Sequence, residues 1–179
     1  MKVDYLIVGM GLAGLAFAEE LEKNQKSFLV FEDRSQNSSV VAGGMYNPVI
    51  LKRFTPVWNA ISQLETALPF YAALENQFNK KYNYPIDIYR VFKSIEEQNN
   101  WFEACDKPLL KKYMNPKIIK KNFKGIEADF GYGKLSNTGW IDTKSLLDDY
   151  RNHLSTKNKL KSTCLKYSEL EINEKNESN

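Results

Sequence analysis

Three glycines near the N-terminus stand at the spacing that binds the diphosphate of a dinucleotide. Residues 4–8 read Asp-Tyr-Leu-Ile-Val and predict a fully buried strand of a parallel sheet, and a helical pattern follows the glycines. Gly9, Gly11 and Gly14 thus satisfy G-x-G-x-x-G in its required context. The first glycine permits a tight turn, the second lets a pyrophosphate approach the backbone, and the third lets the helix lie close to the strand. The helix N-terminus then offers its amides to the phosphates.

An acidic residue after the next predicted strand supports this dinucleotide site. Residues 27–31 predict the strand, and Glu32 follows it, 18 positions after Gly14. A carboxylate there can accept hydrogen bonds from both ribose hydroxyls and would repel a 2′-phosphate, which disfavours NADP. A surface glutamate after a chance glycine-rich turn is the alternative. The complete order favours the site, to which Met10, Leu12 and Ala13 also belong.

Composition limits the function classes. The chain has 179 residues, 42% of them hydrophobic, which is enough for a core. Its net charge of +3 comes from interleaved acids and bases, so no basic face for nucleic acid is expected. No apolar run reaches the length of a membrane span and no signal peptide precedes the first strand, so we expect a cytoplasmic protein without a membrane partner.

The residues that usually ligate metals or act as nucleophiles are few. Cys105 and Cys164 lie far apart without metal spacing, and reduced thiols are expected. His153 is the single histidine and lies near the end of a predicted helix, where it suits the helix dipole. The sequence predicts no metal site and no Ser-His-Asp triad, and it identifies no catalytic side chain.

The remaining pattern predicts an α/β protein with an insertion. Thr55 and Pro56 predict a helix start, Pro69 should kink or split that helix, and Trp58 and Phe70 are expected in the core. Ser94 predicts a helix cap, and an amphipathic helix follows Asp142. We expect a first part of the cofactor domain in residues 1–83, an inserted strand-rich segment in 84–141, and a return to the cofactor domain in 142–179 with a frayed polar tail from 169.

These segments together resemble the FAD-dependent oxidoreductases of the D-amino-acid oxidase and glycine oxidase superfamily. Glu32, Asp33 and Arg34 stand where that family places its adenosine-ribose acid. The stretch from Ser38-Ser39 to Ala42-Gly43-Gly44 is similar to the family's loop beside the flavin, and residues 139–142, Gly-Trp-Ile-Asp, resemble its return element before a helix. The resemblance implies a Rossmann-like FAD/NAD(P)-binding fold of the GR2 type with an inserted α+β substrate domain, in a truncated form.

The resemblance also implies a reaction and its cofactor. FAD would oxidise the C–N bond of an amino acid or secondary amine by hydride transfer to the flavin, so a small-molecule substrate is the expected partner. Gly43, Gly44 and Met45, with Ala42, are the residues implied at the flavin. The substrate candidates are Asn47, Arg53 and Arg90, although Arg53 could also be a solvated arginine and Arg90 a structural ion pair.

Three alternatives stay open at this stage. An NAD-dependent dehydrogenase would share the glycine motif but usually continues the βαβ pattern after the acid. The FAD domain of an oxidoreductase that modifies the wobble uridine of tRNA would have a similar fold but a basic face. A truncated polypeptide that binds nucleotide weakly and catalyses nothing is the third alternative.

Overall fold

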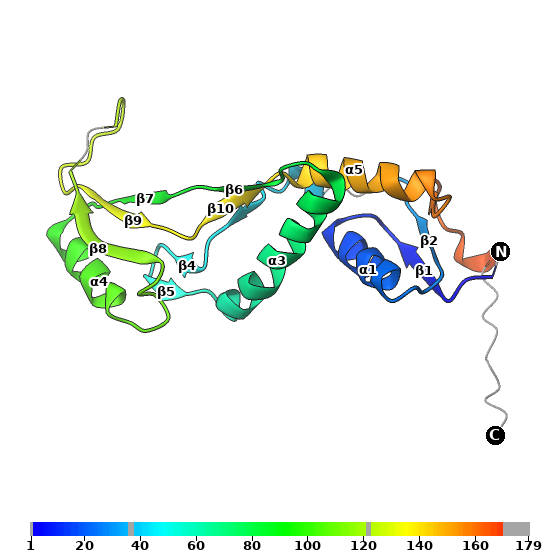
Figure 1. Ribbon diagram of the computed structural model, residues 1–179. Coiled ribbons are helices and arrows are strands. Elements are labelled where there is room, and N and C mark those ends of the chain that lie inside the picture. The colour runs from blue at the N-terminus through cyan, green and yellow to red at the C-terminus, as the bar shows by residue number, and fades with distance from the viewer. Residues whose placement is uncertain (1, 36–37, 121–122, 170–179) are drawn as a thin grey trace, which may run out of the picture. The chain divides into compact units, whose positions relative to one another are not determined.

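The computed structural model describes residues 2–35, 38–120 and 123–169 (Figure 1). The chain divides into two compact units: residues 1–42 with 143–179 form the first, and residues 43–142 form the second. Apart from residue 169, the polar tail that the sequence predicts lies outside the described residues.

The first unit is built on a parallel βαβ motif. Strand β1 (Tyr5–Val8) leads into helix α1 (Leu12–Lys23) and then strand β2 (Phe28–Phe31). β1 and β2 pair in parallel from Tyr5↔Phe28 to Val8↔Phe31, and β11 (Leu160–Lys161) pairs in parallel with the other edge of β2. The unit also contains α2 (Ser38–Val41), α5 (Thr143–Thr156) and a 3₁₀ helix at Tyr167–Glu169. The strand–helix–strand order predicted from the sequence is confirmed.

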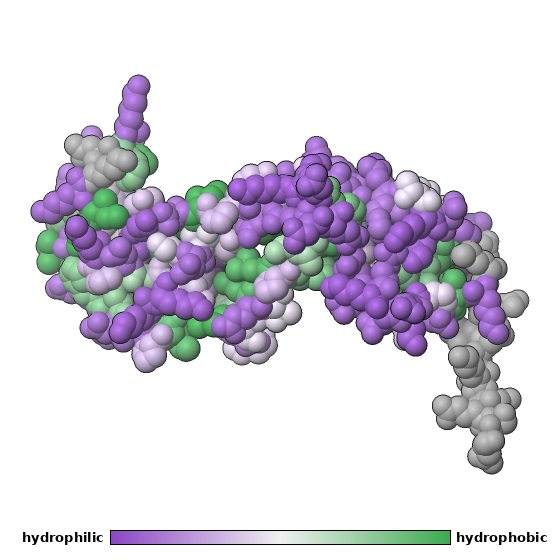
Figure 2. All heavy atoms as spheres, in the orientation of Figure 1, coloured by the Kyte–Doolittle hydropathy of each residue, from purple (hydrophilic) through white to green (hydrophobic). Residues whose placement is uncertain are grey.

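Two amphipathic helices supply the core of this unit. The buried face of α1 includes Leu15, Ala18 and Leu21, which lie three residues apart in the sequence and so share one face of the helix. Helix α5 contacts α1 and β11, and it buries the residues that its periodicity indicates, Leu146, Leu147, Tyr150 and Leu154. The visible surface over α5 is largely hydrophilic, as expected for the outer face of such a helix (Figure 2).

The prediction that the first strand is fully buried was wrong. Only Ile7 of β1 is buried, whereas Tyr5, Leu6 and Val8 are 40%, 42% and 54% exposed. The reason is the position of β1 at the edge of its sheet, whose order is β1-β2-β11. An edge strand has a hydrogen-bonded neighbour on one side only, so its apolar residues lose cover that a central strand would have.

The second unit combines antiparallel sheets with two helices. Its elements are β3 (Met45–Tyr46), β4 (Val49–Ile50), β5 (Thr55–Pro56), α3 (Ala60–Phe78), β6 (Asn83–Pro85), β7 (Ile88–Val91), α4 (Ile95–Cys105), β8 (Met114–Ile119), β9 (Tyr132–Leu135) and β10 (Gly139–Ile141). The sheets have the orders β3-β10-β6, β4-β5 and β7-β9-β8. Helix α4 begins as predicted, because the Ser94 hydroxyl accepts a hydrogen bond from the Glu97 amide at 3.1 Å.

An aromatic cluster fills the core of this second unit. Trp101 is fully buried and meets Phe54 and Phe92 in edge-to-face contacts, each with ring centroids 5.4 Å apart. Its indole nitrogen donates to the Asn115 carbonyl at 2.9 Å, so the burial leaves no polar atom of the ring without a partner. This cluster packs α4 against residues of β4, β8 and β9.

The segment around Thr55 differs from its prediction. Thr55 and Pro56 form β5 and pair with Ile50 and Val49, so α3 begins only at Ala60. The helix then continues through Pro69 without a break, since proline removes one N–H donor while the flanking turns keep theirs. Trp58 lies in the turn before the helix and is 84% exposed, so its expected place in the core was wrong; Phe70 is half-buried.

The predicted domain boundary at residue 83 also differs from the observed division. The second unit begins at residue 43, because β10 pairs with both β3 and β6 and so joins the segment before residue 83 to the segment after it. At the other end, the expected return at residue 142 lies one residue from the division at 142/143.

Candidate dinucleotide site

The glycine loop between β1 and α1 has the geometry that its sequence predicts. Gly9 has φ +94°, a conformation that favours glycine, and its amide donates to the Phe31 carbonyl at 2.8 Å. A Cβ added to Gly14 would lie 2.2 Å from the Gly9 carbonyl oxygen, so only glycine allows this approach of the helix. The loop therefore turns tightly and brings the N-terminus of α1 close to the end of β1.

The first turn of α1 presents backbone amides without a side-chain cap or acidic residues of its own. Gly11 occupies the N-cap position, and the first turn contains no acid. The Ser39 hydroxyl, from α2, accepts a hydrogen bond from the Leu12 amide at 3.3 Å. A Cβ on Gly11 would lie 3.0 Å from that same oxygen. An oxygen acceptor thus already sits at this helix end, which fits a place for phosphate oxygens. The sequence had associated Ser39 with the flavin loop but not with these amides.

The predicted ribose acid is buried and held by an arginine that the sequence did not single out. Glu32 accepts from Arg151 through both oxygens, Nε to Oε2 and Nη2 to Oε1, each at 2.8 Å. Arg151 Nη2 also donates to the carbonyl of Met10 in the glycine loop at 3.2 Å. The hydrogen bond to Glu32 raises the pKa of Arg151 although burial opposes it, so the guanidinium stays charged.

The two residues after Glu32 are exposed. Asp33 accepts a hydrogen bond from the Ser35 amide at 2.9 Å, and hydrogen bonds from the Ser35 side chain and backbone lower the pKa of Asp33. Arg34 has φ +58° in the same turn. The structure therefore brings Glu32 and Met10 together through Arg151, whereas Asp33 and Arg34 face solvent beside them.

The residues expected at the flavin lie where the chain passes in sequence from the first compact unit to the second. Ala42 is exposed and ends the first segment of the first unit, and Gly43 to Asn47 open the second unit. Gly44 accepts from the Ile141 amide at 2.9 Å, and Met45 is 68% exposed. The Asn47 side chain accepts from the Val49 amide at 3.0 Å and so closes a local turn. Their roles at a flavin stay predictions.

The two arginines proposed for substrate binding have different surroundings. Arg90 donates through Nε to Glu97 at 3.0 Å, and both side chains are mostly buried, which supports the structural ion pair that the sequence left open. Arg53 is exposed and lines a cavity of about 370 Å³, whose other lining residues are Lys52, Phe54, Glu97, Asn100, Glu103 and Lys107. Arg53 therefore stays the better placed of the two for an anionic ligand.

Within the described ranges, no group of three histidine, cysteine, aspartate or glutamate side chains is arranged to hold a metal ion. Cys105 is buried and Cys164 exposed, and neither forms a disulfide. Among the helices of the described residues, none is both long and apolar enough to cross a membrane.

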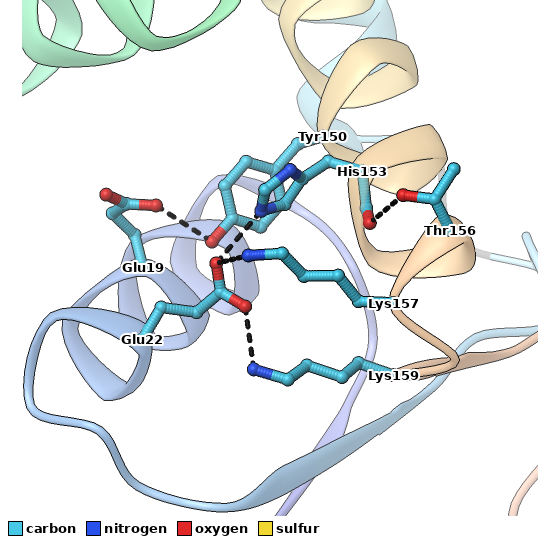
Figure 3. A network of polar contacts seen from close by, with 7 residues as sticks. All are labelled: Glu19, Glu22, Tyr150, His153, Thr156, Lys157 and Lys159. Atoms are coloured by element: carbon cyan, nitrogen blue, oxygen red, sulfur yellow. Dashed lines mark hydrogen bonds and ion pairs between the residues drawn. The ribbon is translucent and has the colours of Figure 1, made fainter.

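A second polar cluster fixes α1 against the end of α5 (Figure 3). The Glu22 carboxylate accepts hydrogen bonds from the ammonium groups of Lys157 at 2.9 Å and Lys159 at 2.7 Å. Its Oε2 atom also lies 2.9 Å from His153 Nε2. Burial raises the pKa of Glu22, but the hydrogen bonds to His153, Lys159 and Lys157 outweigh it and lower the value to about 2. The place of His153 in this cluster is structural.

Comparison with known proteins agrees with this architecture. Residues 7–74 match the family model described as an NAD(P)-binding Rossmann-like domain. Among solved structures, glycine oxidase from Bacillus cereus has 18% identity and a TM-score of 0.60, and the match covers 89% of this chain and 46% of that one. The L-amino acid deaminase from Proteus myxofaciens, solved with anthranilate, has 12% identity and a TM-score of 0.61, and the match covers 89% of this chain and 37% of that one. The L-α-glycerophosphate oxidase from Mycoplasma pneumoniae, solved with FAD bound, has 21% identity and a TM-score of 0.52, and the match covers 89% of this chain and 44% of that one.

The chain therefore has the Rossmann-like α/β fold of the N-terminal part of larger flavoprotein structures. The fold that the sequence resemblance implies is thereby confirmed. The chain spans between 37% and 46% of the length of the three structures above. Their different names also show that this fold serves more than one kind of substrate.

Proposed function

We propose that this chain is the dinucleotide-binding part of an FAD-dependent oxidoreductase that oxidises the C–N bond of an amino acid or secondary amine. The observation that carries the proposal is the joint placement of the glycine loop and Glu32, which Arg151 links through hydrogen bonds to Met10 and to both carboxylate oxygens. The loop supplies the phosphate-binding amides and Glu32 the acceptor for the ribose hydroxyls.

The residues present fit an adenine dinucleotide. Gly11 lets an oxygen acceptor approach the Leu12 amide, as the Ser39 hydroxyl does, and a Cβ there would lie 3.0 Å from that hydroxyl. Glu32 is 8% exposed, so it can contact a ligand while its other partners hold it in place. When bound, FAD supplies the hydride acceptor, and the task of the polypeptide is to bind and orient it and to exclude water.

The substrate class rests on the names of two similar structures, a glycine oxidase and an L-amino acid deaminase. Such substrates carry a carboxylate, and an exposed arginine suits a carboxylate. Of the candidates in this chain, Arg53 is free to meet solvent, whereas Arg90 already pairs with Glu97. We propose Arg53 and Asn47 ahead of Arg90, a small-molecule substrate as the partner, and a cytoplasmic location.

The first test is the ligand itself. We expect the purified full chain to bind FAD, read as an oxidised-flavin absorbance that stays with the protein, and to bind ADP, which contains the half of FAD that the glycine loop contacts. Gly11→Val should abolish ADP binding without unfolding the chain, since its side chain would fill the phosphate position. Gly43→Ala is the control for ADP binding alone, because a Cβ there has no atom within 4 Å and the residue is implied at the flavin and not at the ADP half of FAD.

The same assay separates the competing functions. A colourless protein that binds NADH would favour a dehydrogenase, which the description of the matching family model also supports. Unchanged ADP binding in Gly11→Val would remove the nucleotide from the glycine loop. A chain that binds neither flavin nor ADP would overturn the proposal.

A further inference from the structure

Three charged side chains are buried among the described residues, Glu19, Glu32 and Arg151, and two of them form one pair at the glycine loop. Arg151 is 7% exposed and comes from α5, 119 positions from Glu32 in the chain. Burying a charge is costly unless it is paired and hydrogen-bonded, so the placement of this pair calls for a physical account.

The pair has the geometry of a rigid clamp. Nε and Nη2 of Arg151 each donate to a different oxygen of Glu32 at 2.8 Å, a side-on fork that fixes the plane of the carboxylate. The Asp148 carboxylate accepts from Nη1 at 3.1 Å and so holds the outer edge of the guanidinium. Lysine could place a charge here but could not reproduce the fork.

The clamp also reaches the phosphate-binding loop. Nη2 donates to the Met10 carbonyl, which lies between Gly9 and Gly11, at 3.2 Å. Since the Met10 side chain is buried, both its backbone carbonyl and its side chain are fixed to the body of the unit. One guanidinium thereby ties the loop proposed for the diphosphate to the acid proposed for the ribose.

The carboxylate keeps acceptor capacity for a ligand. Two oxygens offer about four lone-pair sites, and the fork uses one on each oxygen. The remaining sites match the two adjacent hydroxyls of a ribose, each of which can donate one hydrogen bond.

We propose that Arg151 is a positioning residue for the adenosine ribose: it fixes the plane of the Glu32 carboxylate for contact with the ribose diol while it fixes the glycine loop at Met10. This inference rests on the proposed dinucleotide site. If the pair served only to stabilise the fold, apolar residues could replace it without loss of stability. A positioning role and a purely structural role are therefore distinguished by ligand binding and not by stability.

The test compares the affinities of ADP and 2′-deoxy-ADP for the full chain by calorimetry. The wild-type chain should prefer ADP by about 10-fold or more, the effect of a hydrogen bond to a charged group. Arg151→Lys keeps the charge but loses the fork, so the preference should fall to about 1–3-fold because the carboxylate is no longer aligned. Arg151→Met should do the same if it folds, which its thermal unfolding will show.

Two further variants make the result specific. Tyr150→Phe removes the neighbouring buried hydrogen bond to Glu19, 3.1 Å long, and should lower thermal stability while the ADP preference is kept. In a Glu32→Gln background, Arg151→Lys should change the preference no further, because both residues act through one contact.

The outcomes separate this inference from the proposed function. Wild-type preference for ADP that survives in Arg151→Lys leaves the dinucleotide site intact and overturns the positioning role. ADP binding without any preference over 2′-deoxy-ADP in the wild type removes Glu32 from the ribose: it overturns this inference and the ribose contact of the proposed function, but leaves the diphosphate contact of the glycine loop. A wild-type chain that does not bind ADP overturns both.

Discussion

The two compact units of this protein both have apolar cores but differ in the buried polar contacts that they add. In the first unit, α1, β2 and α5 are joined by buried polar pairs, Arg151 with Glu32 and Tyr150 with Glu19, and by the cluster around Glu22. The second unit is centred on the apolar contacts of Trp101 with Phe54 and Phe92. Apolar packing stabilises a fold without regard to direction, whereas hydrogen-bonded charges fix orientation, which a binding site requires.

The largest expected effect is on the aromatic core of the second unit. Trp101→Ala should lower the free energy of unfolding by about 3–5 kcal/mol, because it leaves a large cavity between Phe54 and Phe92. Denaturant unfolding measures this loss. Trp58→Ala is the matched control, since that side chain is 84% exposed, and it should change stability by less than about 0.5 kcal/mol. Equal losses in both variants would contradict the assignment of the core.

The next effect concerns the helix approach in the first unit. Gly14→Ala places a Cβ 2.2 Å from the Gly9 carbonyl, so the loop or helix must shift, at a cost of about 1–3 kcal/mol. ADP binding should weaken as well, because the loop moves. Gly43→Ala adds the same methyl group in open space and should change neither quantity. Full ADP affinity in Gly14→Ala would show that the loop tolerates displacement.

The smallest expected effect concerns the polar cluster around Glu22 and the dependence of the free energy of unfolding on pH. The pKa of Glu22 is about 2 in the folded chain against an ordinary 4.5, so its contribution is complete above pH 4.5 and is lost as the pH falls through about 2. Glu22→Gln should cost about 1 kcal/mol at neutral pH, since its lysine partners are partly in water, and it should flatten the acid limb of stability.

Urea unfolding at a series of pH values between 7 and 2 measures this acid response. Burial raises the pKa of Glu97 in the second unit, but the hydrogen bonds from Arg90 and from the Lys93 amide outweigh it and lower the pKa. Glu97→Gln removes this carboxylate and is the comparison variant over the same pH range. An acid limb in Glu22→Gln as steep as in the wild type would refute the role given to the cluster.

The sequence predicted the parts of the fold that local pattern determines. The glycine loop, α1 and β2 follow from residues within one βαβ motif, and α4 follows from the Ser94 cap. Arg151 could not be found in this way, because it lies on an amphipathic helix where arginine is usually exposed and its partner is 119 positions distant. Burial of β1 also failed as a prediction, since exposure depends on the neighbouring strands and not on the strand's own residues.

The segment from Thr55 to Trp58 shows that a local sequence signal can also predict the wrong element. Thr-Pro is typical of a helix start, but proline is equally compatible with a two-residue strand pairing such as that of β5 with β4. The Val57 amide also donates a hydrogen bond to the Pro48 carbonyl at 2.8 Å. The competing hairpin contacts decided the outcome. Pairing between segments, unlike capping, leaves no signature within the segment itself.

The central claim is that the glycine loop and Glu32 hold one adenine dinucleotide, and amide NMR during an ADP titration tests it most directly. We predict that the largest shift changes fall on the amides of Gly11, Leu12 and Ala13 and on Glu32, with smaller changes along α5 at Arg151. Shift changes that gather instead around Lys52, Arg53 and Lys107, the cations lining the cavity of the second unit, would contradict it.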